Sequence, residues 1–358
     1  MELSRNTYLE VKSKVIKENI EKIINKNPKY KYYFGVVKAN CYGIEDEEFN
    51  VTKNIIKAGC NYLAVATLEE GIEIRRKIKE IPILVLGHIP EKYVKEAIKN
   101  NITLTVHSLE YLKEILKESD IKNIRIHLKV DTGMNRLGIK DKEELEKTYN
   151  LCKEKGLNVE GIFTHIYNAS SKKDYEKQIE KFKEITSKIP LNEIPIVHIP
   201  ASEALINYPK LEFVNGARLG IIMYGLTDKK ELDLKSPIKL ISEVVQIHNL
   251  EKGETVGYNA KFVADKKTRI AVVPIGYADG IIRKNSGRSV YINDKKYKIV
   301  GNICMDMLFL EVDENVKEYD KVEIIKDNNH IEQIANYLDT IPYEVLTNIG
   351  NRVIRKVI

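Results

Sequence analysis

Short runs rich in β-branched and aromatic residues alternate with longer amphipathic stretches between residues 33 and 225. In the longer stretches, such as residues 68–79, 91–99 and 174–188, apolar positions recur at helical spacing among many Lys and Glu residues. Parallel strands are joined by helical crossovers, so this alternation predicts a repeated strand–helix unit. The eight predicted strands cover residues 33–37, 62–66, 83–86, 102–106, 124–130, 161–164, 196–199 and 212–217.

The number of these units indicates an α/β fold that begins with a (β/α)8 barrel of the TIM type. A closed barrel needs eight successive units, because its parallel sheet rejoins itself after the eighth strand. An open, doubly wound sheet remains the alternative, since the pattern alone does not show whether the first and last strands meet. Both folds place their functional residues at the carboxyl ends of the strands.

The pattern changes after about residue 230, where strand-like segments follow one another with few helical stretches between them. Turn residues separate the segments, as in Glu251-Lys252-Gly253, and only residues 329–338 and 343–348 have helical periodicity. We therefore assign residues 1–232 to the barrel and 233–358 to a mostly β domain, and allow the first ten or so residues to pair with the β domain. The predicted strands of this domain cover residues 240–248, 269–274, 290–292, 298–300, 308–312 and 321–325.

The composition excludes several classes of protein. Hydrophobic residues make up 43% of the 358 residues and charged residues 31%, which is typical of a globular chain and not of a disordered one. No apolar run approaches the roughly 18 residues of a membrane helix, and the N-terminus does not resemble a signal peptide, so we expect a cytoplasmic protein without a membrane partner. The net charge of +6 is spread along the chain, which argues against a nucleic-acid partner.

The four cysteines, Cys41, Cys60, Cys152 and Cys304, are far apart and form no CxxC pair. Neither disulfides nor a metal site is expected from such spacing, and buried thiols are the ordinary alternative.

Several polar residues follow the predicted barrel strands closely. Lys38 follows the first strand, and a partly desolvated lysine there has a lowered pKa and can form an imine with an aldehyde cofactor. The loops after strands seven and eight are the usual phosphate site of such barrels, and they carry Ser202 and the backbone amides of Gly220 and Ile221. Arg218 adds a partner for a ring nitrogen. Together these residues fit pyridoxal 5'-phosphate (PLP), although each alone is equally explained by packing or solvation.

Seven segments in order along the chain resemble motifs of the alanine racemase family. Two of them are Val37-Lys38-Ala39-Asn40-Cys41-Tyr42-Gly43 and Pro274-Ile275-Gly276-Tyr277-Ala278-Asp279-Gly280. The others are residues 129–138, 218–225, 256–258, 304–306 and 343–345. The segments run from residue 37 to residue 345, so the resemblance covers most of the chain.

The resemblance implies a PLP-bearing barrel, a C-terminal β domain, and a head-to-tail homodimer in which the β domain of each chain completes the site of the other. By motif, Lys38 would hold PLP and carry a proton on one face of the substrate, and Tyr258 of the partner chain would do so on the other. Racemisation needs two opposed proton carriers, because a single base returns the proton to the face it left. A free phenol, with a pKa of about 10, is a poor base and needs tuning by its surroundings.

The resemblance also assigns the remaining site residues. Arg218 would face the pyridine nitrogen, and His165 would lie against the ring. The phosphate would be held by Tyr42, Ser202, the amides of Gly220 and Ile221, and Tyr343. The substrate carboxylate would meet Arg136 and the Met305 amide of the partner chain, Tyr277 would narrow the entrance, and Lys129 matches a position that some members carbamylate. No role is assigned to His88, His107, His127, His198, His248 or His330.

The chain departs from the family pattern at several positions. Ile44-Glu45 replaces the usual His-Gly, and Ala201 replaces an Asn before the phosphate serine. Ser170 stands where the family commonly has Asp, and Asn302 where it commonly has a basic residue. In family members these last two positions approach each other across the dimer. Their change from a charge pair to a neutral pair predicts a more permissive entrance that admits serine or larger amino acids.

The sequence therefore predicts a PLP-dependent amino-acid racemase that interconverts L- and D-alanine and supplies D-alanine for peptidoglycan. A racemase of serine or basic amino acids is one alternative. A PLP-dependent decarboxylase is a weaker one, because the glycine-rich phosphate motif and the cysteine motif of that class have no counterparts here. A non-catalytic PLP-binding protein is the third, but such proteins resemble the barrel alone.

Overall fold

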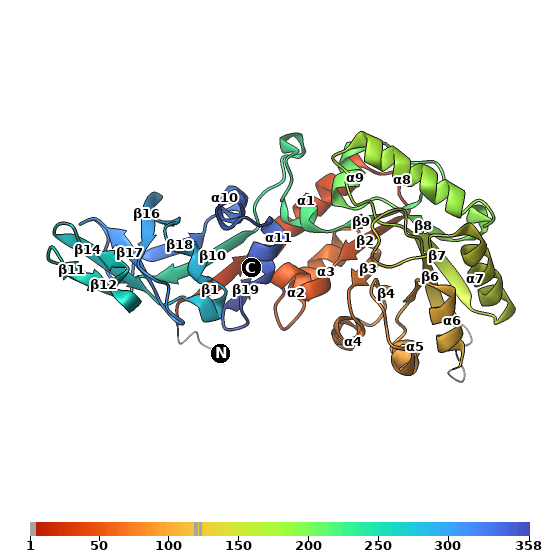
Figure 1. The fold of residues 1–358 in the computed structure, drawn as a ribbon, viewed down its shortest axis with the longest axis horizontal. Helices are drawn as coiled ribbons and strands as arrows, with labels where there is room; N and C mark the ends of the chain where they lie inside the picture. The colour runs from red at the N-terminus through yellow and green to blue at the C-terminus, as the bar shows by residue number, and fades with distance from the viewer. Residues whose placement is uncertain (1–4, 118–120, 122–123) are drawn as a thin grey trace.

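The computed structural model describes residues 5–117, 121 and 124–358 of the chain. The first part of the chain winds into a barrel at one end of the molecule, and the cyan-to-blue part forms a β-rich domain at the other (Figure 1). Strand β1 (Tyr8–Val11), although N-terminal, lies in the β-rich domain. The chain therefore starts in that domain, builds the barrel, and then returns.

Eight parallel strands form a closed barrel, in the order β4-β3-β2-β9-β8-β7-β6-β5. The ring closes between β4 and β5, where Leu84 bridges Thr103 and the Val85 amide donates to the Thr103 carbonyl at 3.0 Å. The closed barrel is thus confirmed, and the open sheet is excluded. The strands are β2 (Tyr32–Val36), β3 (Tyr62–Val65), β4 (Ile83–Val85), β5 (Leu104–Val106), β6 (Arg125–Lys129), β7 (Asn158–Phe163), β8 (Ile196–His198) and β9 (Gly216–Leu219).

Amphipathic helices cover the outside of the barrel and turn their apolar faces toward it. Several begin at side-chain caps, such as Thr67, which forms a capping box with Glu70, and Ser108, which accepts from the Tyr111 amide. The helices are α1 (Ser13–Lys26), α3 (Asn50–Lys57), α4 (Leu68–Lys77), α5 (Val94–Lys99), α6 (Leu109–Leu116), α7 (Lys142–Glu154), α8 (Lys172–Ile185) and α9 (Ser202–Asn207). The short element α2 (Lys38–Gly43) follows β2 at the barrel mouth and is a left-handed turn.

The second domain is built on a nine-stranded sheet in the order β11-β14-β17-β16-β15-β18-β10-β1-β19. Strand β1 lies between β10, to which it is antiparallel, and β19, to which it is parallel. Helices α10 (Asn328–Leu338) and α11 (Pro342–Thr347) lie between strands β18 and β19 in the chain. The other strands are β10 (Ile238–Glu243), β11 (Gln246–Leu250), β14 (Thr268–Val273), β15 (Ser289–Ile292), β16 (Lys295–Val300), β17 (Leu308–Val312), β18 (Lys321–Ile325) and β19 (Ile354–Val357).

Two predicted strands differ from the structure. The segment 240–248 is two strands, because at Val244 and Val245 the chain changes its hydrogen-bond partner from β18 to β14. The last barrel strand begins at Gly216 and not at residue 212. The Asn215 side chain accepts a hydrogen bond from the Val197 amide of the neighbouring strand β8 at 2.9 Å. The residues before Asn215 form a turn and do not extend the strand. Arg218 therefore lies within the strand.

Candidate active site

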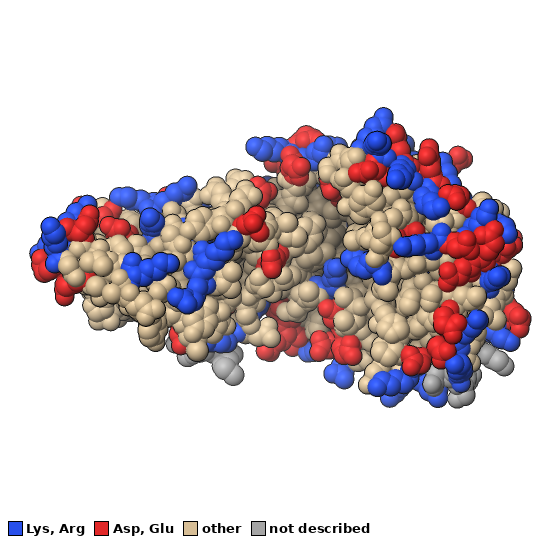
Figure 2. Space-filling view, in the orientation of Figure 1, with Lys and Arg blue, Asp and Glu red and all other residues tan. Residues whose placement is uncertain are grey.

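A hollow of about 340 Å³ opens at the carboxyl ends of the barrel strands. Figure 2 shows the molecule recessed between the barrel and the β-rich domain, with basic side chains beside the recess and both signs of charge interspersed elsewhere on this face. The structure brings ten predicted site residues together here. They are Lys38, Tyr42, Lys129, Arg136, His165, Ser202, Arg218, Gly220, Ile221 and Tyr343.

The segment that carries Lys38 has an unusual backbone. Ala39, Asn40, Cys41 and Tyr42 all have φ between 50° and 59°, the left-handed region, which costs non-glycine residues about 1–2 kcal/mol each. Hydrogen bonds across the turn hold it: the Cys41 amide donates to the Val37 carbonyl at 3.0 Å, and the Ala39 amide donates to Glu70 Oε1 at 2.7 Å. The turn lets Lys38 and Tyr42 line the same hollow.

The Lys38 amine is partly buried and lines the hollow. Burial, reinforced by the nearby Arg136 guanidinium, lowers the pKa of Lys38 from its ordinary value, although Glu70 opposes the shift. Within the described part of the chain, the Lys38 side chain makes no hydrogen bond. A free amine with a lowered pKa is the form that attacks carbonyl carbon.

Gly220 forms a cradle between two hydroxyl groups. A Cβ at this position would lie 2.8 Å from the Tyr42 hydroxyl and 3.4 Å from Ser202 Oγ, so only glycine leaves the space open. The Gly220 amide lies 3.1 Å from Ser202 Oγ. Burial raises the pKa of Tyr42, so its hydroxyl keeps its proton and remains a donor. The cradle thus offers the Tyr42 and Ser202 hydroxyls to an anion.

Arg218 is buried beneath the hollow, and both of its Nη atoms have hydrogen-bond partners. Its Nη1 lies 2.8 Å from His198 Nδ1, and its Nη2 donates to the carbonyls of Thr164 and Ile199, each at 2.9 Å. Nη2 also lies 3.3 Å from His165 Nδ1. Burial lowers the pKa of Arg218 to about 9, so it is still a cation at neutral pH.

Two further titratable groups in the hollow have lowered pKa values, so that at pH 7 His165 is neutral and Lys129 is about half neutral. Burial, together with the positive charges of Arg218 and Lys129, lowers the pKa of His165 to about 3. Burial and Arg218 also lower the pKa of Lys129 to about 7. The Lys129 amine donates to the Val130 carbonyl at 2.9 Å.

Three predicted site residues lie outside the hollow. Tyr258, Tyr277 and Met305 are on loops of the β-rich domain and are 70%, 41% and 52% exposed. Backbone hydrogen bonds join two of these loops: the Tyr277 amide donates to the Cys304 carbonyl at 3.0 Å. Within one chain they therefore form a separate, exposed group.

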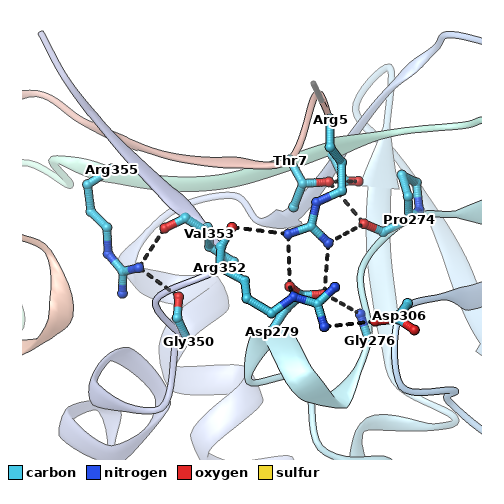
Figure 3. Close-up of polar contacts among 11 residues, drawn as sticks. Arg5, Thr7, Pro274, Gly276, Asp279, Asp306, Gly350, Arg352, Val353 and Arg355 are labelled. Atoms are coloured by element: carbon cyan, nitrogen blue, oxygen red, sulfur yellow. Dashed lines mark hydrogen bonds and ion pairs between the residues drawn. The ribbon is translucent and has the colours of Figure 1, made fainter. Parts of the chain in front are cut away.

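An ion-pair cluster around the buried Asp279, which the sequence did not reveal, supports these loops (Figure 3). Asp279, two residues after Tyr277, accepts from Arg5 at 2.8 and 3.1 Å and from the Gly276 amide at 2.9 Å. Arg352 lies 3.6 Å from Asp279 and donates to Asp306 at 2.8 Å. Arg5 and Arg352 come from opposite ends of the chain, so no local sequence pattern predicts their contact with Asp279.

The sequence also assigned no role to His198 and His127, which lie behind Arg218 in the barrel interior. The available signal was position: His127 is two residues before Lys129 on strand β6, so both side chains face the same side of the strand. Within the described ranges, 5–117, 121 and 124–358, no cluster of three or more His, Cys, Asp or Glu side chains is arranged to hold a metal ion. In the same ranges no helix is long and apolar enough to cross a membrane.

These features define a class: a (β/α)8 barrel whose mouth holds a partly buried lysine amine and a glycine between two hydroxyl groups, joined to a second, β-rich domain. The family models match this division. "Alanine racemase, N-terminal domain" matches residues 11–228, and "Alanine racemase, C-terminal domain" matches residues 238–357. The chain belongs to the alanine racemase family and is an isomerase of that family.

Individual relatives agree over almost the full length. Alanine racemase 1 of Bacillus subtilis is 38% identical over 364 residues, covering 98% of this chain and 92% of the relative. The Clostridium tetani alanine racemase is 39% identical, covering 89% and 87%. The crystal structure of alanine racemase from Bacillus anthracis with bound L-Ala-P has a TM-score of 0.93 at 32% identity, covering 100% of this chain and 96% of that one. Because both domains match, the hypothesis of a barrel-only PLP-binding protein is set aside.

Proposed function

We propose that the protein interconverts L- and D-alanine, uses PLP as its cofactor, and acts as a homodimer. The observation that carries this proposal is Lys38, a half-buried amine with a lowered pKa in a barrel mouth, in a chain whose relatives are named alanine racemase. A cytoplasmic location and a supply of D-alanine for peptidoglycan belong to the same proposal and rest on the family resemblance.

The barrel mouth fits PLP in size and in chemistry. Lys38 offers an amine to the aldehyde, the cradle at Gly220 offers the Tyr42 and Ser202 hydroxyls to the phosphate, and Arg218 offers a cation to the ring nitrogen. Tyr343 of helix α11 adds a further hydroxyl, with its ring centroid 5.8 Å from that of Tyr42. When bound, PLP supplies an electron sink that makes the α-proton of an attached amino acid removable.

Arg218 sets the character of that electron sink. Its guanidinium remains protonated and donates hydrogen bonds only, so a ring nitrogen facing it must accept and stay unprotonated. By keeping such a nitrogen unprotonated, Arg218 would favour simple return of the proton over side reactions. His165, neutral because of its lowered pKa, accepts from Arg218 and lies beside it in the hollow.

The two proton carriers must come from different chains. Lys38 is in the hollow, but Tyr258 is 70% exposed on a loop of the other domain. We therefore assign Tyr258 to the site of a second copy, together with Tyr277 and the Met305 amide. Other large apolar side chains in the same loops are exposed as well, including Met307 and Val263, as expected of a surface that a second copy covers.

Arg136 is assigned to binding the substrate carboxylate, and Lys129 is assigned to orienting Arg136. The Arg136 side chain lines the hollow and makes no hydrogen bond within the described residues. Lys129, with a pKa of about 7, is about half neutral at pH 7, so a free amine is available. We propose that this amine adds to carbon dioxide, forming a C–N bond and releasing one proton, and that the resulting carbamate orients Arg136.

Broader specificity remains a second candidate because of two neutral residues at the predicted entrance. Ser170 is exposed and donates to Asn168 Oδ1 at 3.0 Å, and Asn302 donates to the Tyr258 carbonyl at 2.9 Å. Neither contributes a charge that would reject a larger or a basic substrate. Tyr343 and Tyr277 nevertheless narrow the site, so alanine is the preferred substrate of this proposal.

The test is incubation of the PLP-loaded protein with a panel of L-amino acids in heavy water. α-Proton loss is followed by NMR and the product is analysed on a chiral column. We expect exchange and racemisation of alanine. Extension to serine or lysine would support the permissive entrance, and no exchange with any amino acid would refute the proposed function.

A further inference from the structure

A line of buried polar side chains runs from Arg218 through the barrel interior to its opposite end. Arg218 Nη1 lies 2.8 Å from His198 Nδ1, and His198 Nε2 lies 2.9 Å from His127 Nδ1. His127 Nε2 lies 3.3 Å from Glu160 Oε2. Both histidines are completely buried. The line therefore joins a buried cation to a carboxylate through two imidazole rings.

The barrel backbone is shaped to accommodate these rings. A Cβ at Gly161 would lie 2.5 Å from the His127 ring, and a Cβ at Gly216 would lie 2.8 Å from His198 Cβ. Strand β7 has a register shift against β6, in which Val159 pairs with Ile126 and Gly161 with His127. Glu160 is thus the extra, unpaired residue of a bulge, and bulges redirect side chains.

The surroundings of the line bury both imidazole rings and keep Glu160 charged. The His198 ring is stacked between Phe34 and Phe163, each with its centroid 4.5 Å away. The Tyr62 hydroxyl donates to Glu160 at 2.7 Å. Although burial acts to raise it, the pKa of Glu160 is held below its ordinary value by hydrogen bonds from His127 and Tyr62 and by the charge of Arg125.

The two ends of the line allow one arrangement of protons. Glu160 accepts only, so His127 Nε2 must carry a hydrogen, and its Nδ1 must then accept from His198 Nε2. Arg218 donates only, so His198 Nδ1 must be unprotonated. Both requirements are met when each histidine is neutral and protonated at Nε2. Burial lowers the pKa of both rings, in agreement with neutral histidines. An additional proton on either ring would place two donors face to face.

We infer that Glu160 is a positioning residue for Arg218: it is the remote counter-ion of the arginine and, through His127 and His198, orders the hydrogen bond that orients the guanidinium. This inference rests on the proposed function for its effect on catalysis, because Arg218 is the group assigned to the cofactor ring. Within the described residues, Arg218 has no carboxylate within ion-pair distance. The two neutral imidazole rings then connect the Glu160 carboxylate to the Arg218 guanidinium through hydrogen bonds of fixed direction.

Neutron diffraction from deuterium-exchanged crystals of the PLP-loaded protein tests the proton order directly. We expect deuterium on Nε2 of both His127 and His198, and none on either Nδ1 or on Glu160. Deuterium on Nδ1 of either ring would overturn the inference. This measurement uses the unaltered chain and does not depend on whether any variant folds.

Variants at Glu160 test the effect on the reaction. Glu160→Leu removes the acceptor and the charge, and we expect kcat for alanine to fall roughly tenfold with KM changed less than about twofold. Glu160→Gln keeps an acceptor oxygen, so kcat should recover to within about threefold of wild type. Tyr62→Phe is the matched control, because it removes one donor to Glu160 but leaves the line intact.

The outcomes separate this inference from the proposed function. Equal losses in all three variants, or a fall in thermal stability without a change in kcat, would indicate a packing role only and refute the inference. Lack of racemisation by the wild-type protein would refute the proposed function while leaving the neutron result valid.

Discussion

The barrel mouth and the loops of the β-rich domain carry parts of one proposed site in opposite ways. In the barrel, the functional side chains are buried or half-buried, and their pKa values are shifted by burial and by one another, as with Lys38, Lys129 and His165. In the β-rich domain, Tyr258, Tyr277 and Met305 face solvent. The barrel half of the proposed site is organised within a single chain, whereas the half on the β-rich domain is exposed on the surface.

The difference indicates where the free energy of organising the site comes from. Folding of the barrel orders its half, because the same strands that bury the core also hold Lys129, His165 and Arg218 at their carboxyl ends. The exposed loops are held at their base by the Asp279 ion-pair cluster, and in the proposed dimer their tips would gain burial from the second copy. The following experiments change one half at a time.

Replacing the barrel amine should have the largest effect. Lys38→Ala removes the group assigned to both cofactor attachment and proton transfer, so we expect racemisation of alanine to fall by about four orders of magnitude or more. Chiral chromatography of the product measures this loss. Circular dichroism should be unchanged, and retention of more than a few percent of activity would rule out the assigned role.

Replacing the exposed phenol should be nearly as severe, although Tyr258 is far from the hollow of its own chain. Tyr258→Phe removes only the hydroxyl oxygen, and loss of a positioned acid–base group typically costs about 10²–10⁴-fold. Initial rates in both directions measure the effect. The matched control is Tyr319→Phe, which alters an equally exposed tyrosine of the same domain and should leave the rates unchanged.

The ion-pair cluster at the base of the loops should contribute chiefly to stability. Asp279 is fully buried, so Asp279→Ala leaves Arg5 without its partner, and we expect a loss of about 3 kcal/mol in the free energy of unfolding. Asp306→Ala is the matched control, because it removes the 53%-exposed carboxylate bound by the same Arg352 and should cost less than about 1 kcal/mol. Urea denaturation compares the two, and equal costs would contradict the argument.

Much of the fold could be predicted from the sequence, for a physical reason. Strands that are buried on both faces consist of continuous β-branched runs, so the first seven barrel strands were found within a few residues of their observed bounds. Residues directly after such strands, such as Lys38 and Ser202, could be placed at one end of the barrel without further information. The roles assigned to them remain proposals.

Other features depend on contacts that no local pattern records. The left-handed turn from Ala39 to Tyr42 contains no glycine, so propensity argues against it, and tertiary hydrogen bonds such as the one from Ala39 to Glu70 impose it. The inward position of Glu160 follows from a bulge, which a period-two pattern does not predict. The pairing of Arg5 with Asp279 joins residues 274 positions apart.

Acidification should destabilise the barrel half through His165. An unfolded histidine takes up a proton below a pH of about 6.5, whereas folded His165 does so only near its pKa of about 3. The free energy of unfolding should therefore decrease as the pH falls from 6.5 toward 3, by about 2 kcal/mol at pH 5 for this residue. Denaturation of the cofactor-free protein at several pH values measures the slope. His165→Asn should reduce it, and the exposed-strand variant His248→Gln should not.

Mixing two inactive variants gives the smallest effect but tests the division between the two halves most directly. If each site combines the barrel of one chain with the loops of the other, a dimer of Lys38→Ala and Tyr258→Phe chains has one site with both changes and one with neither. Random association makes half of the dimers mixed, so about a quarter of the wild-type activity should return when the variants are unfolded and refolded together. Refolding each variant alone is the control. If Tyr258 served the barrel of its own chain, the mixture would remain as inactive as its components, and the shared site would be disproved although both single variants behaved as expected.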